Sequence, residues 1–170
     1  MLIKYTIQAS PLGRILVAAT EKGISMVSLG DSDQDLIAAL QERYPAADCQ
    51  WDNDYCHKLI AVLLAYLSGS LPKLDLPIDI GTTAFRLKVY EALKAIPYGE
   101  TCSYEEVAQA IGSPKAVRAV GSACANNPVA LIVPCHRVVR KDGSLGGYRW
   151  GLGRKVKLLE MERRFTPLVT

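Results

Sequence analysis

The residues with the greatest chemical potential are a cysteine, a histidine and an arginine that follow one another directly. Cys135, His136 and Arg137 lie between the apolar segments 131–133 and 138–139. Burying a thiol, an imidazole and a guanidinium among valines and isoleucines costs free energy unless each group has a polar partner. A free thiol becomes a strong nucleophile at neutral pH only when a base or a positive charge favours the thiolate. The triplet therefore predicts a nucleophilic Cys135 that is activated by His136 or Arg137.

A nucleophile–base pair of this kind needs a third group that orients the histidine. The predicted last helix, 153–164, offers two carboxylates, Glu160 and Glu162, and residue chemistry alone does not choose between them. The alternative interpretation is that Cys135 is an inert buried thiol and His136 a core histidine with satisfied hydrogen bonds. For an isolated Cys-His pair this alternative is the commoner case, so the surrounding sequence has to decide.

The segment before the triplet is predicted to be helical. Thr82 or Thr83 can cap a helix whose apolar residues recur on one face until the turn at 97–99. Ser103 and Glu106 have the spacing of a capping box, which opens a short helix that the next glycine stops. These elements place two helices directly before the region of the triplet.

A further short helix is predicted directly after Gly112. Ser113 as the N-cap and Pro114 in the first turn open this helix, which runs to about Ala125. Two short helices joined by a Gly-Ser turn are typical of a helix-turn-helix, although any helical hairpin shares the pattern. Tight packing against another helix explains the small residues of this segment, but it does not explain Arg118.

The first half of the chain is predicted to form strands and then helices. The expected elements are strands at 2–7, 14–19 and 24–29, and helices from Ser32 to before Pro45 and at 55–67. Residues 68–77 contain Gly, Ser and Pro and are predicted to be a linker. We therefore expect a structural lobe at 1–77, in which we find no chemistry, and a second lobe at 78–170.

Length and composition limit the class of protein. The 170 residues can form one domain or two small lobes, and 49% apolar with 22% charged residues excludes disorder. No apolar run approaches the roughly 20 residues of a membrane-spanning helix, and the first residues lack the pattern of a signal peptide. We expect a cytoplasmic protein without membrane association.

The number and spacing of the cysteines agree with a cytoplasmic protein. The five cysteines are odd in number and none has C-x-x-C spacing, so neither a disulfide framework nor a zinc site is expected. Cys56 and His57 could share in a metal site, but the surface of a helix is the favoured interpretation. Cys102 and Cys124 are interpreted as packing residues. The sequence predicts no metal and no other cofactor.

The two halves of the chain differ in charge. Residues 1–80 contain 6 Lys and Arg against 10 Asp and Glu, whereas residues 81–170 contain 14 against 7. A basic half predicts an acidic partner, most commonly nucleic acid, or simply a solvated basic surface.

The sequence around the triplet resembles the methylated-DNA–protein-cysteine methyltransferases, also called O6-alkylguanine-DNA alkyltransferases. The matching segments are Pro-Cys-His-Arg-Val-Val at 134–139, Ile-Pro-Tyr-Gly-Glu at 96–100, Ser-Tyr at 103–104, Pro-Lys-Ala-Val-Arg-Ala-Val-Gly at 114–121, Asn-Pro at 127–128 and Gly-Tyr at 147–148. They cover residues 82–165 densely. The first lobe is also similar to bacterial members of the family at 13–18 and 44–48.

The resemblance implies both a fold and an activity. The implied α+β fold has an N-terminal α/β lobe with a small antiparallel, ribonuclease H-like sheet and a C-terminal helical lobe with a winged helix-turn-helix. The implied partner is double-stranded DNA carrying O6-alkylguanine, bound through the minor groove by a monomer. The damaged base would be flipped out, and its alkyl group would pass irreversibly to Cys135, once per protein molecule and without a cofactor.

The family's functional residues carry over one position at a time. The nucleophile falls on Cys135, the histidine that acts on it through a water falls on His136, and the carboxylate that orients the histidine falls on Glu162. Asn127 would brace the turn before the active-site strand. Tyr104 would donate a proton to the departing guanine.

The resemblance also implies contacts to DNA and to the damaged base. Arg118 would fill the gap that the flipped base leaves in the stack. The other implied positions are DNA contacts at Ser103, Ser113, Lys115 and Ala116 and pocket residues at Pro134, Val138, Tyr148 and Arg149. Arg149 and Trp150 depart from the mammalian pattern, where position 149 is a small serine, so they are expected to narrow or rim the pocket. The mammalian zinc ligands near the amino terminus have no counterpart here.

Two other classes of function share some of these residues. A Cys-His-Glu hydrolase or acyltransferase would use Cys135, His136 and Glu162, but it would need an oxyanion hole and would not need a helix-turn-helix with Arg118. A DNA binder without catalysis, such as an alkyltransferase-like protein, would replace the nucleophile, usually with tryptophan. Because position 135 is a cysteine, the alkyltransferase is the favoured interpretation.

Overall fold

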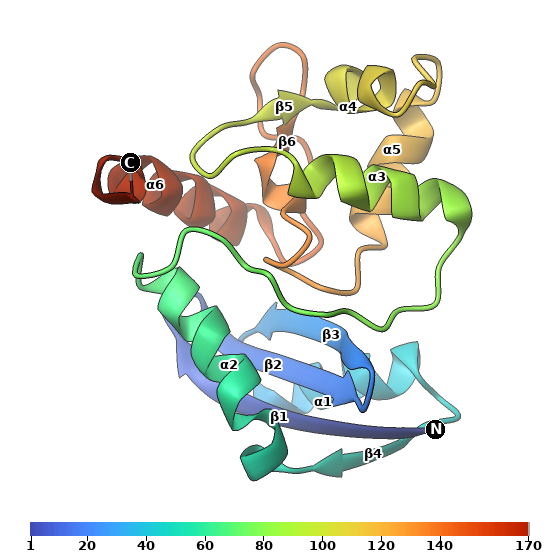
Figure 1. The fold of residues 1–170 in the computed structure, drawn as a ribbon, viewed down its shortest axis with the longest axis vertical. Helices are drawn as coiled ribbons and strands as arrows, with labels where there is room; N and C mark the ends of the chain where they lie inside the picture. Colours follow the sequence, from blue (N-terminus) through green and yellow to red (C-terminus); the bar gives the residue numbers. More distant parts are fainter. Residues whose placement is uncertain (170) are drawn as a thin grey trace. The chain divides into compact units, whose positions relative to one another are not determined.

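A computed structural model describes residues 1–169 and their side chains through Thr166. The chain divides into two compact units, Met1–Ile80 with Pro128–Ile132, and Gly81–Asn127 with the residues from Val133 onward. The first unit contains a four-stranded sheet and two helices, and the second is mainly helical (Figure 1). The predicted α+β class is confirmed. None of the described helices is both long enough and apolar enough to cross a bilayer.

The sheet of the first unit contains the three predicted strands and one that was not predicted. Strands β1 (Leu2–Ser10), β2 (Gly13–Thr20) and β3 (Gly23–Gly30) pair antiparallel, and β4 (Asp48–Trp51) adds to β1 in parallel. The sheet order is β3-β2-β1-β4. Because β4 is a short edge strand whose residues are exposed or half-buried, it lacks the run of apolar residues that identified the other three strands.

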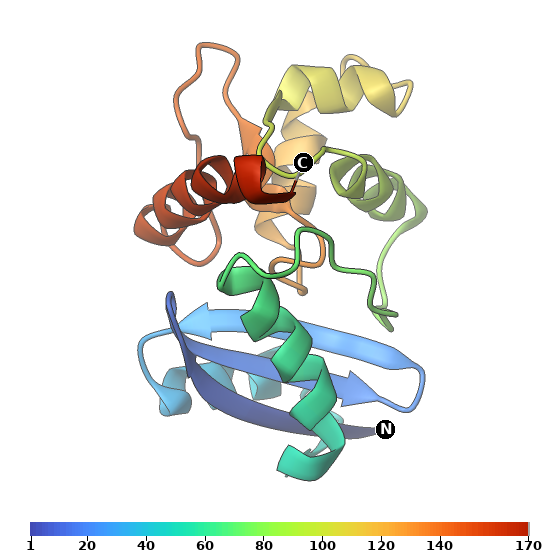
Figure 2. The ribbon, with the colours of Figure 1, turned by 60° about the vertical axis from the view of Figure 1, so that its left-hand side comes forward.

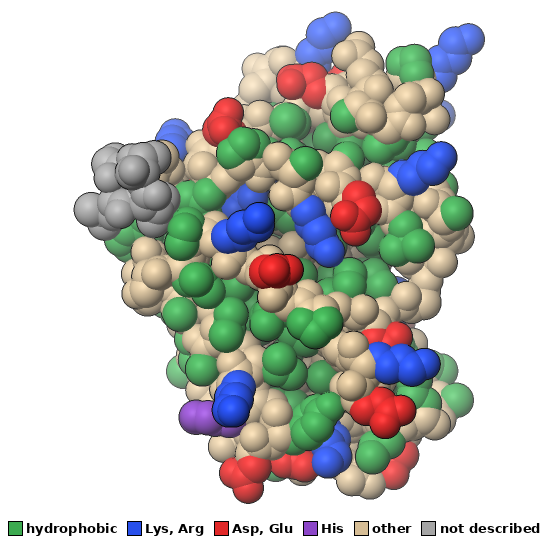
Figure 3. Space-filling model, viewed as in Figure 1, with side chains coloured by type: hydrophobic (Ala, Val, Ile, Leu, Met, Phe, Trp, Pro, Cys, Tyr) green, Lys and Arg blue, Asp and Glu red, His purple; other side chains and the backbone are tan. Residues whose placement is uncertain are grey.

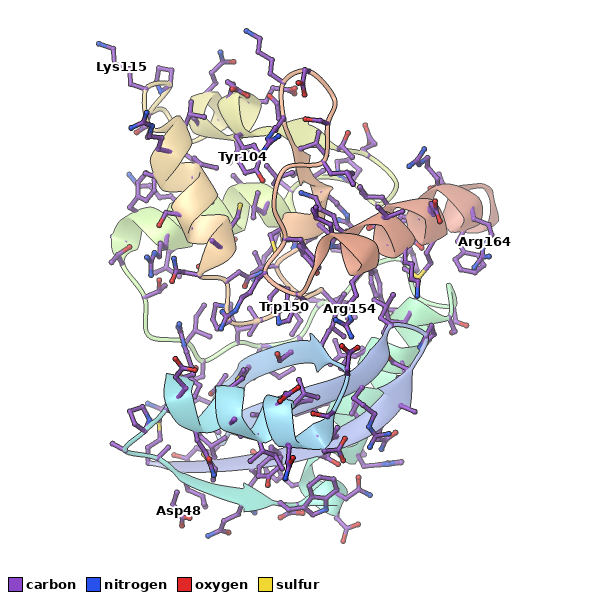
Figure 4. The ribbon with its side chains drawn as sticks, turned by 180° about the vertical axis from the view of Figure 1, so that it is seen from behind. Asp48, Tyr104, Lys115, Trp150, Arg154 and Arg164 are labelled. Atoms are coloured by element: carbon purple, nitrogen blue, oxygen red, sulfur yellow. The ribbon has the colours of Figure 1, made fainter. Side chains whose placement is uncertain are left out.

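Two helices cover opposite faces of this sheet (Figures 1 and 4). Helix α1 (Asp33–Arg43) begins after Ser32, whose hydroxyl accepts a hydrogen bond from the Asp35 amide as the sequence predicted. Helix α2 (Asn53–Leu67) begins two residues earlier than predicted because Asp52 caps it. The core between α1 and the sheet consists of apolar side chains from both: Ile3, Ile7, Leu16, Ala18, Met26, Leu36 and Leu40.

The first unit also includes the segment Pro128–Ile132, which leads to the Cys-His-Arg triplet. Val27 of β3 donates a hydrogen bond to the Pro128 carbonyl and accepts one from the Ala130 amide, both at 3.0 Å. Leu131 has a φ of 72°, and the Ile132 amide donates to the Ala130 carbonyl at 2.8 Å. This is a γ-turn in a strained conformation for a residue other than glycine. The approach to the triplet is therefore fixed at a sheet edge.

The second unit packs four helices around a two-stranded parallel ribbon. Its elements are α3 (Ala84–Lys94), β5 (Cys102–Ser103), α4 (Tyr104–Ala110), α5 (Val117–Ala125), a 3₁₀ helix η1 (Cys135–Arg137), β6 (Val138–Val139) and α6 (Leu152–Val169). Figure 2 shows the 140–147 loop projecting at the edge of this unit, above α6, before the chain returns to that helix. Thr83 caps α3, and the capping box of Ser103 and Glu106 at α4 is complete, as predicted.

The predicted start of the helix after Gly112 is wrong. Helix α5 begins at Val117 after Ala116, rather than at Pro114 after a Ser113 cap. Gly112 has a φ of 76°, and the Ser113 amide donates to the Ala108 carbonyl at the end of α4. This pattern is a Schellman motif, so Ser113 completes the preceding helix instead of opening the next one. A turn closed by the bond from the Ala116 amide to the Ser113 carbonyl then precedes α5.

Candidate active site

The thiol of Cys135 is held by an amide from a neighbouring turn. Its sulfur accepts a hydrogen bond from Asn127 Nδ2 at 3.3 Å, and the same amide donates to the Val133 carbonyl at 3.0 Å. The Cys135 amide donates back to that carbonyl across Pro134, so the chain forms a tight turn and then η1. The segment after Asn127 is therefore a series of turns that leads into η1, and Cys135 is the first residue of that 3₁₀ helix.

The two residues that follow Cys135 form a buried network of charged and polar side chains with Glu162 of α6. His136 Nε2 is 3.0 Å from Glu162 Oε1, and Arg137 binds the same carboxylate through Nε at 2.6 and 3.0 Å. Arg137 also donates to the Ile96 carbonyl at 2.7 Å. His136 and Glu162 are 0% and 1% exposed. Glu160, the alternative in the sequence, is exposed, so Glu162 is the carboxylate that meets His136.

The pKa values follow from burial and from these partners. Burial lowers the pKa of His136 by more than the Glu162 contact raises it, so the imidazole is neutral at pH 7. Burial alone would raise the pKa of Glu162, but the hydrogen bonds and charges of His136 and Arg137 lower it. Burial raises the pKa of the Cys135 thiol to about 11, although Asn127 and nearby cations oppose this. The resting protein thus carries a protonated thiol beside a neutral imidazole.

One ring nitrogen of the neutral imidazole remains available to accept a hydrogen bond. Because Glu162 is ionised, His136 Nε2 carries the proton that is shared with it, and this assigns the tautomer. His136 Nδ1 is then an acceptor, and among the described residues it is buried without a hydrogen-bond partner. A buried acceptor of this kind is a ready site for an ordered water or for a proton from a neighbouring group.

A cavity of about 720 Å³ opens at the sulfur. It lies within the second unit, and its walls come from α4, α5, η1 and the 140–149 loop: Tyr104, Glu105, Val117, Gly121, Cys124, Ala125, Cys135, Arg140, Lys141, Asp142, Gly146, Gly147, Tyr148 and Arg149. Three of the predicted residues, Tyr104, Tyr148 and Arg149, are therefore brought together with Cys135. Pro134 and Val138 are buried beside it in the chain.

A hydrogen bond connects the 140–149 loop at the rim of the cavity to Asn127, whose side chain holds the thiol. Arg149 donates to the Asn127 carbonyl at 2.7 Å and lies over the Trp150 ring at 5.5 Å. Tyr148 packs edge-on against Trp150 and against His136, with ring centroids 5.3 and 6.5 Å apart. Figure 4 shows Trp150 at the start of α6. Arg149 thus lines the cavity, whereas Trp150 is buried behind Tyr148 and Arg149 and is not among the lining residues.

The predicted DNA-contact residues lie mostly at the surface of α5 and the turn before it. Arg118 and Lys115 are exposed, and Lys115 projects from the tip of the second unit (Figure 4). Ser113 and Ala116 are half-buried. Ser103 differs, because it is 7% exposed and its hydroxyl caps α4. Lys and Arg side chains also stand out from the margin of this unit in Figure 3.

Sequence reasoning missed the part played by Lys155. This lysine is 0% exposed, and its ammonium donates to the carbonyls of Val138 and Gly147 at 2.6 and 3.0 Å, and to that of Leu145. The sequence did contain a signal for a buried lysine, because Lys155 is seven residues before Glu162 and so lies on the same face of α6. That face is otherwise apolar, with Leu158 and Leu159 buried on it.

The alternative metal site in the first lobe does not form. Cys56 is 0% exposed and donates to the Lys4 carbonyl, whereas His57 is exposed on α2. Among the described residues, no group of three or more His, Cys, Asp or Glu side chains could hold a metal ion. The interpretation as a helix surface is confirmed for His57 and wrong for Cys56, which faces the sheet side of α2 and is buried.

Comparison with known proteins gives a consistent result. The family model described as 6-O-methylguanine DNA methyltransferase, ribonuclease-like domain, matches residues 3–80, and the DNA binding domain of the same family matches residues 84–164. The "Bifunctional transcriptional activator/DNA repair enzyme Ada" of Escherichia coli is 50% identical over 160 residues, which are 94% of this chain and 45% of that protein. The chain thus spans slightly less than half the length of this relative.

Two further relatives match along their whole length. The methylated-DNA–protein-cysteine methyltransferase of Mycolicibacterium paratuberculosis is 38% identical over 168 residues, which are 98% of this chain and 96% of that protein. The structure of Mycobacterium tuberculosis OGT in complex with DNA has a TM-score of 0.83 and 35% identity, and the match covers 97% of this chain and 94% of that one. Since both halves of the sequence are matched, the chain belongs to the 6-O-methylguanine DNA methyltransferase family.

Proposed function

We propose that this protein repairs DNA by transferring an alkyl group from O6-alkylguanine to its own Cys135. The observation that carries this proposal is the setting of the thiol. Cys135 accepts a hydrogen bond from Asn127, opens into a cavity of about 720 Å³ and shares η1 with a buried histidine–glutamate pair. The matches to methylated-DNA–protein-cysteine methyltransferases support the choice of substrate.

The first step is the loss of the thiol proton. We assign the acceptance of this proton to His136, whose neutral imidazole would take it at Nδ1 through a water molecule while Glu162 stabilises the imidazolium that forms. The Asn127 amide then stabilises the thiolate, since a hydrogen bond to the charged form favours that form. The high pKa of the resting thiol, about 11, explains why such a base is needed.

The second step is transfer of the alkyl group. The sulfur lone pair forms a bond to the alkyl carbon while the bond from that carbon to O6 breaks, and its electron pair moves into the guanine ring. Tyr104 lines the cavity and donates its phenolic proton to the departing base, and the proton held by His136 restores the tyrosine. The product is a thioether, which none of these residues can hydrolyse, so each molecule reacts once and needs no cofactor.

Access to the lesion requires the damaged base to leave the duplex. O6 lies on the base-pairing edge of guanine, so the base has to be flipped out before a thiol can reach it. We place DNA on α5 and the turn before it, with Arg118 filling the gap in the stack and with contacts at Ser113, Lys115 and Ala116. The small residues of α5 suit the narrow minor groove, whose sequence-poor pattern fits a protein that searches for damage. Ser103 would act from the cap of α4, next to Tyr104.

The pocket and the rest of the chain have supporting roles. Tyr148, Arg149, Val138 and Pro134 would shape the space for the flipped base. We assign the second unit, Gly81–Asn127 with the residues from Val133 onward, as the DNA-binding alkyltransferase lobe, and the first unit as its structural support. Basic side chains of the second lobe would give sequence-independent, salt-sensitive affinity. We expect a monomer that acts in the cytoplasm.

The proposal is tested by intact-protein mass spectrometry after incubation with a DNA duplex that contains one O6-methylguanine. The wild type should gain one methylene per molecule and then stop, Cys135→Ser should gain nothing, and Cys56→Ser should behave as the wild type. Tight binding to the lesion without any gain would indicate a lesion binder without catalysis. Neither gain nor binding would favour the hydrolase.

A further inference from the structure

Lys155 is a buried charge that the proposed alkyl transfer does not use. An ammonium has three N–H donors, and Lys155 directs one to the Val138 carbonyl of β6 and two to the carbonyls of Leu145 and Gly147 in the loop that follows β6. A neutral amine could donate only two hydrogen bonds. The three acceptors therefore favour the charged form, although burial lowers the pKa of Lys155. A buried cation is tolerated only when it is fully hydrogen-bonded in this way.

The clamped loop meets the proposed proton donor at Gly146. Gly146 lies between the two carbonyls at 145 and 147 and has a φ of 69°. A Cβ atom added there would lie 2.8 Å from the Tyr104 hydroxyl oxygen and 3.1 Å from its ring, so the loop backbone is packed directly against Tyr104. In Figure 4 the Tyr104 side chain lies between α4 and this loop.

We propose that Lys155 is a positioning residue for alkyl transfer, which holds residues 145–147 against Tyr104 and so fixes both the proton donor and the cavity wall that leads to Tyr148. The inference rests on the proposed function, because it takes Tyr104 as the donor to guanine. The titratable and charged groups that face Lys155 are Cys124 of α5, Cys135 and His136 of η1, and Arg140 of the loop. Its positive charge also favours the thiolate of Cys135.

The first test compares two lysines of α6. Lys155→Met removes the clamp, whereas Lys157→Met makes the same change in charge at an exposed position. In single-turnover reactions with the O6-methylguanine duplex, Lys155→Met should be slower by roughly ten- to a hundredfold, as expected for a misplaced reacting group. Lys157→Met should stay close to the wild type once the duplex is saturating. A wild-type rate in Lys155→Met would overturn the proposal.

A double-mutant cycle separates positioning from general destabilisation. If Lys155 acts largely through Tyr104, the rate loss caused by Lys155→Met should be at least about threefold smaller in the Tyr104→Phe background, because residues coupled through one backbone segment are not additive. The pH dependence of Cys135 alkylation by iodoacetamide, followed by peptide mass spectrometry, should also show a raised thiol pKa in Lys155→Met and not in Lys157→Met. An undiminished loss in the Tyr104→Phe background would contradict the inference.

A second pair of variants tests the same contact if Lys155→Met does not fold. Gly146→Ala and Gly143→Ala each place a methyl group at positive φ in the same loop, but only the Gly146 position meets Tyr104; the Gly143 position is open. Gly146→Ala should slow transfer as Lys155→Met does, and Gly143→Ala should not. Equal rates for the two would overturn the inference. Failure of the wild type to take up methyl would instead contradict the proposed function.

Discussion

Two buried thiols, one in each unit, show how differently the same side chain can be held. Cys56 donates a hydrogen bond to the Lys4 carbonyl at 3.4 Å, whereas Cys135 accepts one from the Asn127 amide at 3.3 Å. Burial raises the pKa of both thiols to about 11. A bond that the thiol donates stabilises its protonated form, while a bond that sulfur accepts stabilises the thiolate. The direction of one hydrogen bond thus separates an inert thiol from one prepared to react.

The same contrast extends to the interiors of the two units. Among the described residues, the buried polar side chains of the first unit are the hydroxyls of Thr6, Ser25 and Ser28. The second unit buries charged and ionisable groups: His136, Arg137, Lys155 and Glu162, together with the polar Ser103 and Asn127. Neutral hydroxyls cost little to bury, whereas a buried charge has to be compensated by its neighbours. Substitutions that remove a partner should therefore have larger effects in the second unit.

The largest effect is expected for Glu162→Ala. This change leaves the Arg137 guanidinium buried without its counter-ion and His136 without its acceptor. We expect a loss of about 3–5 kcal/mol in the free energy of unfolding, measured by urea denaturation, and a strong decrease in the transfer rate. Glu160→Ala, at an exposed position of the same helix, is the matched control and should change neither. The reverse order of effects would show that the wrong carboxylate has been assigned.

A smaller effect is expected for Asn127→Ala. The variant loses the donor to the Cys135 sulfur and to the Val133 carbonyl, which should cost about 1–3 kcal/mol in stability and raise the pKa of the thiol. The measurement is the rate of iodoacetamide reaction at Cys135 against pH. Asn126→Ala, which removes an exposed bond to the Ser122 carbonyl, should leave the profile unchanged. An unchanged profile in Asn127→Ala as well would remove the basis for the contrast with Cys56.

Local signals predicted much of this architecture. Strands β1, β2 and β3 contain short runs of apolar and β-branched residues between glycine-containing turns, and the capping box of Ser103 and Glu106 is formed by residues three apart, so neither signal depends on a distant contact. At Ser113 the sequence is compatible with two roles, the N-cap of α5 and the last residue of a Schellman motif that ends α4. The structure shows the second role, because the Ser113 amide donates to the Ala108 carbonyl. Strand β4 escaped detection because its side chains are largely exposed.

The sequence predicted the parts of the candidate site that consist of reactive side chains. It did not predict the contacts that side chains make with backbone carbonyls. The resemblance led to Cys135, His136 and Glu162, and the structure places the last two in contact. The partners of Lys155 are carbonyls. Since every residue has a carbonyl, no sequence pattern identifies which ones will meet a buried lysine.

Two buried groups of the second unit, His136 and Glu162, should make the free energy of unfolding depend on pH. His136 has a lowered pKa in the folded protein, so the unfolded chain binds the extra proton first as pH falls below about 6.5. Stability should therefore decline from that pH downward. A second decline should begin near pH 4.5, because the pKa of Glu162 is also lowered.

Urea denaturation of the wild type and of His136→Gln checks this assignment. The variant has no imidazole to protonate, so it should lack the decline between about pH 6.5 and 4.5. If both proteins declined alike, the loss would come from other groups, such as the surface carboxylates of the first unit.

The smallest effect is expected for Cys56→Ala, which tests the inert half of the comparison. The substitution removes one buried sulfur and a weak bond to the Lys4 carbonyl, and it should lower the free energy of unfolding by about 1 kcal/mol. The single-turnover transfer rate should not change, because Cys56 belongs to α2 of the first unit and does not line the cavity that holds Cys135. A slower transfer in this variant, measured under conditions where it is fully folded, would mean that the first unit contributes to reactivity and is more than a support. An unchanged rate would support the view that Cys56 is inert and that the reactive setting, with its accepted hydrogen bond and its cavity, belongs to Cys135.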